Sequence, residues 1–240
     1  MFEIERSVVG DESSTPISPD FFKAKIKQIV EHPEYLVGKG SVSEVYALIE
    51  NSQICLKITD PNETYGTINY ELRGERPFFN SPHIEGGFLA ELERLDSDVR
   101  VPRAYYYGTV SVEHPNAESS EVSVLAMEYL DAVSFENVFA LKEDLPASFN
   151  LEPFFEKLEK FFEKMHDKNI YHRDVHEGNI MIDRKTGAPY VIDFGTAAHG
   201  NEEDVYIGSR RGALTKFKKD DSGLRALRRK TQQFLTGVTN

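Results

Sequence analysis

The order of apolar and polar positions predicts strands in the first half of the chain and helices in much of the second. Residues 20–32 place apolar side chains at helical spacing, and Asp20 could cap that helix. Over 35–58, short apolar runs flank glycines and a turn-prone stretch, which predicts three strands joined by two turns. Residues 1–19 are polar and contain two prolines, so we expect them to form a loose leader.

The next part of the chain completes an expected antiparallel sheet. Residues 60–87 are rich in Gly, Pro and Asn and show no clear periodicity. Apolar residues at helical spacing over 88–95 then predict a short amphipathic helix. Strand patterns follow over 105–112 and 122–129, with a polar loop between them.

The second half opens with the clearest helical pattern in the chain. Phenylalanines and other apolar residues recur at i, i+3 and i+4 after Asn150, a candidate cap, and we expect this stripe to be core. Short strands over 180–182 and 190–192 flank a turn, and a last helix is expected over 221–235. The predicted fold class is therefore α+β, with a junction near 128–131. The corresponding divisions are a leader over 1–19, a mainly sheet part over 20–129 and a mainly helical part over 130–240.

Composition indicates a soluble globular protein. The 240 residues can bury a sizeable core, and 40% are hydrophobic and 28% charged. No apolar run reaches the length of a membrane span, and the start does not read as a secretory signal peptide. Cys55 is the one cysteine, which excludes an internal disulfide and fits a reducing, cytoplasmic location.

Charge is unevenly distributed along the chain. The formal net charge is −12, yet residues 210–230 contain nine Lys and Arg residues against two Asp. An acidic chain argues against broad nucleic-acid binding. The basic stretch over 210–230 could contact an anionic partner, or it could be the solvated face of a helix.

Two short patterns in the expected sheet suit a bound phosphate. Gly38 and Gly40, followed by Ser41 and Ser43, lie between two predicted strands, where glycines let backbone N–H groups approach phosphate oxygens closely. Lys57 closes the next apolar strand and could direct its cation at the same oxygens.

A lysine in such a strand needs a carboxylate partner, for which the predicted helix offers two candidates. Glu91 is preferred, because Leu95 then falls one turn further on the same side of the helix, where packing is needed. Glu93 remains the alternative.

The block that carries most of the chemistry lies between the second-half helix and strands. His172-Arg173-Asp174 opens a loop, Asn179 follows five residues after Asp174, and Asp193-Phe194-Gly195 ends an apolar strand. Asp174 could orient a substrate hydroxyl, while Asn179 and Asp193 offer the oxygen ligands that Mg²⁺ prefers. Phosphoryl transfer requires little more than a held triphosphate, a metal ion and an aligned hydroxyl.

In this order and spacing, the chain resembles the protein-kinase-like superfamily over roughly residues 36–235. The resemblance implies a bilobal fold, with an N-lobe antiparallel sheet and a helix like the family's αC, and a reduced, mostly helical C-lobe. It also implies that the cofactors are ATP and Mg²⁺, or Mn²⁺ in place of Mg²⁺. Catalytic roles would fall on Asp174, Lys57, Glu91, Arg173 and His176. Nucleotide-binding roles would fall on Gly38, Gly40, Ser41, Ser43, Val45, Cys55, Lys57, Met127, Glu128, Leu130 and Met181.

Within that set, Val45, Cys55 and Met181 would line the adenine, and Met127 would be the gatekeeper. Backbone groups of Glu128 and Leu130 would read the adenine edge. A hydrophobic column would consist of Leu95, His172 and Phe194.

The sequence also departs from the usual pattern of the family. His176 stands where protein kinases commonly have a lysine, and it could either donate to the transferred phosphate or stabilise the loop. No Ala-Pro-Glu follows the activation segment, so we expect the usual peptide-docking platform to be largely absent. Asp220 or Asp221 could match the family's buried aspartate of the first large C-lobe helix.

Arg173 suggests regulation by phosphorylation of a nearby hydroxyl residue. The candidates for that residue are Thr196, Tyr206 and Ser209.

Three functions remain open from the sequence. The first is a minimal Ser/Thr protein kinase that phosphorylates a protein substrate; it resembles bacterial effector kinases that act on host proteins, which would be secreted into the host cell. The second is a kinase of small molecules, sugars or lipids. The third is a nucleotide-binding pseudokinase or scaffold that works by binding a partner.

Overall fold

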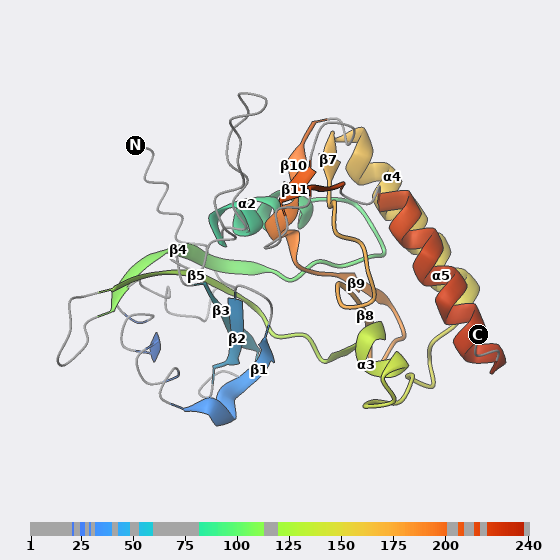
Figure 1. Ribbon diagram of the computed structural model, residues 1–240, viewed down its shortest axis with the longest axis horizontal. Coiled ribbons are helices and arrows are strands. Elements are labelled where there is room, and N and C mark those ends of the chain that lie inside the picture. The colour runs from blue at the N-terminus through green and yellow to red at the C-terminus, as the bar shows by residue number, and fades with distance from the viewer. Residues whose placement is uncertain are drawn as a thin grey trace.

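The computed structural model describes the parts of the chain that form the sheet, the main helices and the loops between them (Figure 1). The described residues are Phe21, Lys25, Ile26, Ile29, 32–39, 43–48, 53–59, 82–112, 120–200, 206–208, 214–216 and 220–237. The expected leader over 1–19 and the Asp20 cap lie outside the described residues.

Five antiparallel strands form the sheet that the sequence predicts. They are β1 (Leu36–Lys39), β2 (Ser43–Ala47), β3 (Ile54–Thr59), β4 (Ala104–Val112) and β5 (Ser120–Glu128). A short 3₁₀ helix η1 (Pro33–Tyr35) precedes them. Their order is β1-β2-β3-β5-β4, so β5 is inserted between β3 and β4. Each of the predicted strands is confirmed within two residues.

The two faces of this sheet have different partners, because side chains alternate along each strand. Tyr46, Leu56 and Ala126 are paired across three strands and lie in one buried cluster with Ile26 and Ile29. Those two isoleucines are helical, which confirms a helix in the expected segment and places its apolar residues over this outer face. The inner face is left to contact the rest of the molecule.

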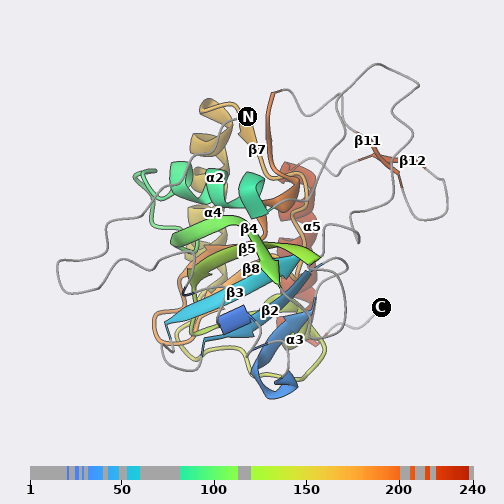
Figure 2. The same ribbon diagram turned by 90° about the vertical axis from the view of Figure 1, so that its left-hand side faces the viewer.

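Helix α2 (Pro82–Leu92) covers part of the inner face (Figure 2). It packs against β3, β4 and β5 and against the 3₁₀ helix η4 (Phe194–Thr196). The sequence predicted a helix over 88–95, which is wrong at both ends. Leu89 and Leu92 are buried as expected, but the helix also includes a Gly86-Gly87 pair whose low helix propensity hides the first two turns from a periodicity argument.

The remaining elements follow β5. They are β6 (Ala132–Ser134), α3 (Phe135–Phe139), α4 (Leu151–Asp167), β7 (Ile170–Tyr171), β8 (Ile180–Asp183), β9 (Pro189–Val191), β10 (Ala198–His199), β11 (Tyr206–Gly208), β12 (Leu214–Lys216) and α5 (Asp220–Thr236). Strands β6, β8 and β9 form a small antiparallel sheet, and β10 pairs with β7. The predicted last helix and the strands of the β8–β9 hairpin are confirmed.

The apolar stripe of α4 is core, as predicted. Its six buried residues are Phe154, Phe155, Leu158, Phe161, Phe162 and Met165. Phe135 of α3 packs its ring against Phe154 and Phe155. Asn150 occupies the N-cap position of α4, but its side chain makes no capping hydrogen bond, so the expected side-chain cap is wrong. Packing of the phenylalanines therefore fixes this helix without a side-chain cap.

Helices α4 and α5 run antiparallel on the side of the molecule away from the sheet, with β8, β9 and α3 between (Figure 1). Arg228 of α5 bonds to Glu152 and Glu159 of α4. Lys230 bonds to Glu177, whereas Arg225 and Arg229 are exposed and form no ion pair within the described ranges. The described end of the basic stretch thus resembles a solvated helix face, and side chains of 210–219 lie outside the described residues.

The chain is therefore an α+β protein with an antiparallel N-terminal sheet followed by a smaller, mainly helical part. Among the residues that the structure describes, no helix is both long and apolar enough to span a bilayer.

The glycine pair in α2 gives a matched test of its packing. A Cβ added at Gly86 would lie 2.4 Å from the Tyr107 ring, whereas one added at Gly87 meets nothing within 4 Å. Gly87→Ala should raise the free energy of unfolding by up to about 1 kcal/mol through helix propensity. Gly86→Ala should lower it by about 1–3 kcal/mol through overpacking. Urea unfolding of both variants measures this, and a shift of the same sign in both would contradict the placement of α2.

Candidate active site

Lys57 occupies the centre of the inner sheet face. It is paired across the strands with Val45 and Leu125, and only 4% of its surface is exposed. Its Nζ donates to Glu85 Oε2 at 2.6 Å and to Asp193 Oδ1 at 2.7 Å. One buried cation therefore joins β3, helix α2 and the turn after β9.

The carboxylate partner of Lys57 is Glu85, and the predictions of Glu91 and Glu93 are wrong. Glu91 lies 3.5 Å from His199, and Glu93 bonds to Arg103 at 2.6 Å. Glu85, by contrast, is 1% exposed and falls in the segment for which the sequence gave no periodicity.

Helical geometry explains the choice of glutamate. Leu89 and Leu92 follow Glu85 at i+4 and i+7, so all three share the buried face of α2, while Glu91 points elsewhere. Leu89 is fully buried in the same cluster as Phe194, one turn after Glu85. Leu95, predicted to occupy that place, lies beyond the end of the helix and is only partly buried.

The charges of this triad depend on one another. Burial alone would lower the pKa of Lys57, but Asp193 and Glu85 raise that pKa well above its usual value. Burial raises the pKa of Glu85, while Lys57 holds the pKa of Asp193 below its usual range despite burial. Lys57 and Asp193 are therefore charged at neutral pH.

The loop between β7 and β8 carries Asp174 and is tied to its neighbours through His172. The His172 ring donates from Nε2 to the Ile192 carbonyl at 2.9 Å, and Nδ1 accepts from the Asp174 N–H at 3.2 Å. That pattern assigns the proton to Nε2. The ring also contacts Phe194, with centroids 4.7 Å apart, so the predicted neighbours in the hydrophobic column meet.

Asp220 supports this loop from the start of α5. It is fully buried, and it accepts the backbone N–H of His172 at 2.8 Å and of Arg173 at 2.7 Å. Of the two aspartates left open by the sequence, Asp220 is thus the buried one, since Asp221 is exposed. Arg173 has φ 71°, and two charge-assisted bonds at this turn help to hold that unfavourable backbone conformation.

A glycine allows α5 to approach this closely. A Cβ at Gly223 would lie 2.4 Å from the Val175 carbonyl oxygen, so any side chain would separate α5 from the loop. The sequence alone did not identify this position, because its requirement is a tertiary contact.

Asn179 and Asp193 lie at the same end of the β8–β9 hairpin, where the Ile192 N–H donates to the Asn179 carbonyl at 3.0 Å. The Asn179 amide nitrogen donates to the Asp174 carbonyl at 2.9 Å. Its amide oxygen and the Asp193 carboxylate are hard oxygen donors, which fit Mg²⁺. No cluster of three or more His, Cys, Asp or Glu among the described residues is arranged as a metal site, so any metal here would rely on few protein ligands.

His176 lies beside Asp174, with Nε2 3.6 Å from its carboxylate. Its Nδ1 accepts the Gly178 N–H at 3.0 Å. The hydrogen bond to Asp174 raises the pKa of His176 above its usual value, although burial opposes this shift. Both roles left open by the sequence, a loop contact and a cation near the reacting groups, are compatible with this position.

The residues predicted to surround the adenine lie along one face of the sheet. Cys55 pairs with Met127, two residues along from the Val45–Lys57 pair, so these four side chains share the inner face. Burial raises the pKa of Cys55 to about 12, which makes its thiol unreactive.

The other predicted nucleotide-binding residues are placed as follows. Glu128 ends β5, Leu130 lies in the connection to β6, and Met181 lies in β8. Gly38 pairs with Val45 in β1, and Ser43 is buried in β2. Gly40 and Ser41 lie outside the described residues.

The phosphorylation hypothesis is only partly accessible. The Thr196 hydroxyl donates to the His172 carbonyl at 3.0 Å, so it is engaged in the loop. Ser209 and the Tyr206 side chain lie outside the described residues.

Comparison with known families now adds an independent observation. The family model described as "Protein kinase domain" matches residues 105–213. The chain belongs to the protein-kinase-like superfamily. That range includes the end of β5, the loop with Asp174 and Asn179, and Asp193, whereas Lys57 and Glu85 precede it. The sheet and α2 thus form the N-lobe of a kinase, and the elements from β6 onward form its C-lobe.

A glutamate pair tests the assignment of Glu85. Glu85→Gln should reduce kinase turnover about 100-fold, because a misplaced Lys57 no longer holds phosphate correctly. Glu91→Gln changes an exposed glutamate on the same helix and should leave turnover within about twofold, as surface ion pairs contribute little. Turnover measured over a range of ATP concentrations distinguishes them, and equal losses would refute the assignment.

The raised pKa of His176 predicts a pH-dependent term in stability. The contribution of the protonated His176–Asp174 pair is fully present below the unfolded pKa of about 6.5 and disappears as pH rises through the folded pKa. The free energy of unfolding of wild type minus His176→Gln should therefore fall between pH 5.5 and 8, by less than about 1 kcal/mol because the pair is partly exposed. Urea unfolding at several pH values measures it, and a difference that grows with pH would contradict the pair.

Proposed function

We propose that this kinase is an ATP- and Mg²⁺-dependent phosphotransferase whose acceptor is a Ser or Thr hydroxyl of a protein. One observation carries most of the proposal: Lys57 is held between Glu85 and Asp193, on the sheet face that looks toward the loop with Asp174. A cation fixed by two carboxylates at this position suits the oxygens of a bound triphosphate.

The roles of the chain's residues follow from their positions. Asn179 and Asp193 would hold Mg²⁺, which when bound neutralises phosphate charge. Lys57 would contact the phosphate oxygens, and Glu85 would keep its ammonium in place. Asp174 would accept the hydrogen bond of the attacking hydroxyl and take its proton as the oxygen attacks the γ-phosphorus and the bond to ADP breaks.

His176 gives the loop a second polar group beside Asp174. Protonated, it could donate to the transferred phosphate, the place filled by lysine in the related protein kinases. Cys55, Val45, Met127 and Met181 would enclose the adenine, while Glu128 and Leu130 would provide backbone contacts. Arg173 would support the loop through its bond to Asp220.

The protein acceptor rests on weaker grounds than the nucleotide. The Arg of His-Arg-Asp favours a protein substrate, and action as a bacterial effector on host proteins is part of this proposal by analogy. A small-molecule, sugar or lipid acceptor, and a purely nucleotide-binding scaffold, are alternatives that the following experiment separates.

Mass spectrometry after incubation with Mg-ATP and a mixture of generic proteins and metabolites tests the proposal. We expect phosphate on Ser or Thr residues with the wild-type chain, and at least a 1,000-fold loss, on the order of that for other catalytic groups, with Asp174→Ala and Asp193→Ala. Label confined to metabolites would refute the protein acceptor. Nucleotide binding without any transfer, unchanged in both variants, would instead support the scaffold.

A further inference from the structure

Arg100 lies in the connection between α2 and β4, at a place where the N-lobe contacts the C-lobe. Its backbone N–H donates to the Pro189 carbonyl at 3.3 Å, and its carbonyl accepts the Val191 N–H at 3.0 Å. Arg100 and Tyr190 thereby form an isolated parallel bridge. This part of the N-lobe is hydrogen-bonded to β9, the strand that leads to Asp193.

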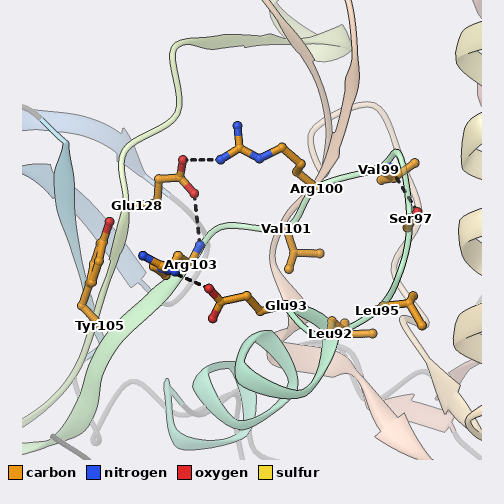
Figure 3. Close-up of a pocket in the computed structure, with 10 residues that line it drawn as sticks. All are labelled: Leu92, Glu93, Leu95, Ser97, Val99, Arg100, Val101, Arg103, Tyr105 and Glu128. Carbon is orange, nitrogen blue, oxygen red and sulfur yellow. Dashed lines mark hydrogen bonds and ion pairs between the residues drawn. The ribbon is translucent and has the colours of Figure 1, made fainter. Parts of the chain in front are cut away.

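The Arg100 side chain extends the same link to the chain segment that joins the lobes (Figure 3). Its Nη1 donates to the Tyr190 hydroxyl at 2.7 Å, and its guanidinium lies 5.1 Å from the centre of the Tyr190 ring. Its Nη2 donates to Glu128 Oε1 at 2.8 Å, while Glu128 Oε2 accepts the Arg103 N–H at 3.3 Å. Glu128 is the last residue of β5, directly before the crossing to the C-lobe.

The region around these contacts is hollow rather than packed. A pocket of about 390 Å³ opens here, and it lies outside the Lys57 site. The residues that line it are Leu92, Glu93, Leu95, Ser97, Val99, Arg100, Val101, Arg103, Tyr105 and Glu128 (Figure 3). Because dispersion contacts across a cavity are few, the coupling between the lobes at this point depends on the polar bonds of Arg100.

We propose that Arg100 is a positioning residue that keeps the segment at Glu128 in register with β9, and thereby holds the nucleotide site in its binding geometry. The proposal rests on the proposed function, since it assumes that backbone groups near Glu128 contact adenine. One guanidinium serves both partners, because its planar fork can bond to Glu128 and Tyr190 at once while its face stacks on the ring. A lysine has a single ammonium and cannot reproduce all three contacts.

Arg103 provides a matched control on the same connection. Its guanidinium is about as exposed as that of Arg100 and bonds to Glu93, which lies in the N-lobe. Arg103→Ala therefore removes one charge and one ion pair without removing a contact to β9, and the backbone N–H of residue 103 remains.

The test compares Arg100→Ala, Tyr190→Phe and Arg103→Ala with wild type by ADP affinity and by hydrogen exchange without nucleotide. We expect Arg100→Ala to weaken ADP binding about threefold to tenfold, the range for partly exposed charge-assisted bonds. Backbone exchange should increase over 125–131 and 189–195 together. Tyr190→Phe, which keeps the ring, should reproduce part of both effects, and Arg103→Ala should stay within twofold in affinity.

Each outcome decides the proposal. ADP affinity within twofold of wild type and unchanged exchange in Arg100→Ala would refute it, as would an equal effect of Arg103→Ala. If Arg100→Ala does not fold, Tyr190→Phe decides by the same two measurements. A wild-type chain that does not bind ADP would contradict the proposed function instead, while exchange over the two segments still tests the link.

Discussion

The arrangement of the whole molecule depends on one buried ammonium group. Lys57 would lose its charge in an apolar interior, and the carboxylates of Glu85 and Asp193 keep it protonated. Because these partners come from α2 and from the turn after β9, their shared bond sets the helix, the sheet and the metal-binding turn relative to one another. Removal of either carboxylate would leave a buried charge with incomplete compensation.

A second buried charge, Asp220, plays the corresponding part in the C-lobe. It satisfies backbone N–H groups at a strained turn, and it thereby connects α5 to the loop that carries Asp174. Gly223 lets the helix come close enough for these bonds to form. The candidate site is thus supported from both lobes by carboxylates whose partners are distant in the sequence, and the contacts of Arg100 add a third link between the lobes.

Sequence patterns predicted most elements because each has a local cause. Alternation in β3 and β5 and the apolar stripe of α4 record which side chains are buried, whatever the partner is. The failures have local causes too. In α2, glycines next to Glu85 obscure the helical period, so the periodic residues further along suggested Glu91 instead. At α4, a residue with good capping chemistry occupies the right position without making the bond.

By itself, the sequence determined the order of the motifs and the chemistry that they offer. Asp174, Asn179 and Asp193 could be recognised because their spacing and residue types are set within short segments. Only the tertiary structure decided which glutamate meets Lys57 and which aspartate lies under the loop. Those choices depend on how α2 and α5 are rotated and how closely they approach the rest of the fold. Packing over the whole molecule fixes both, and no short stretch of residues encodes them.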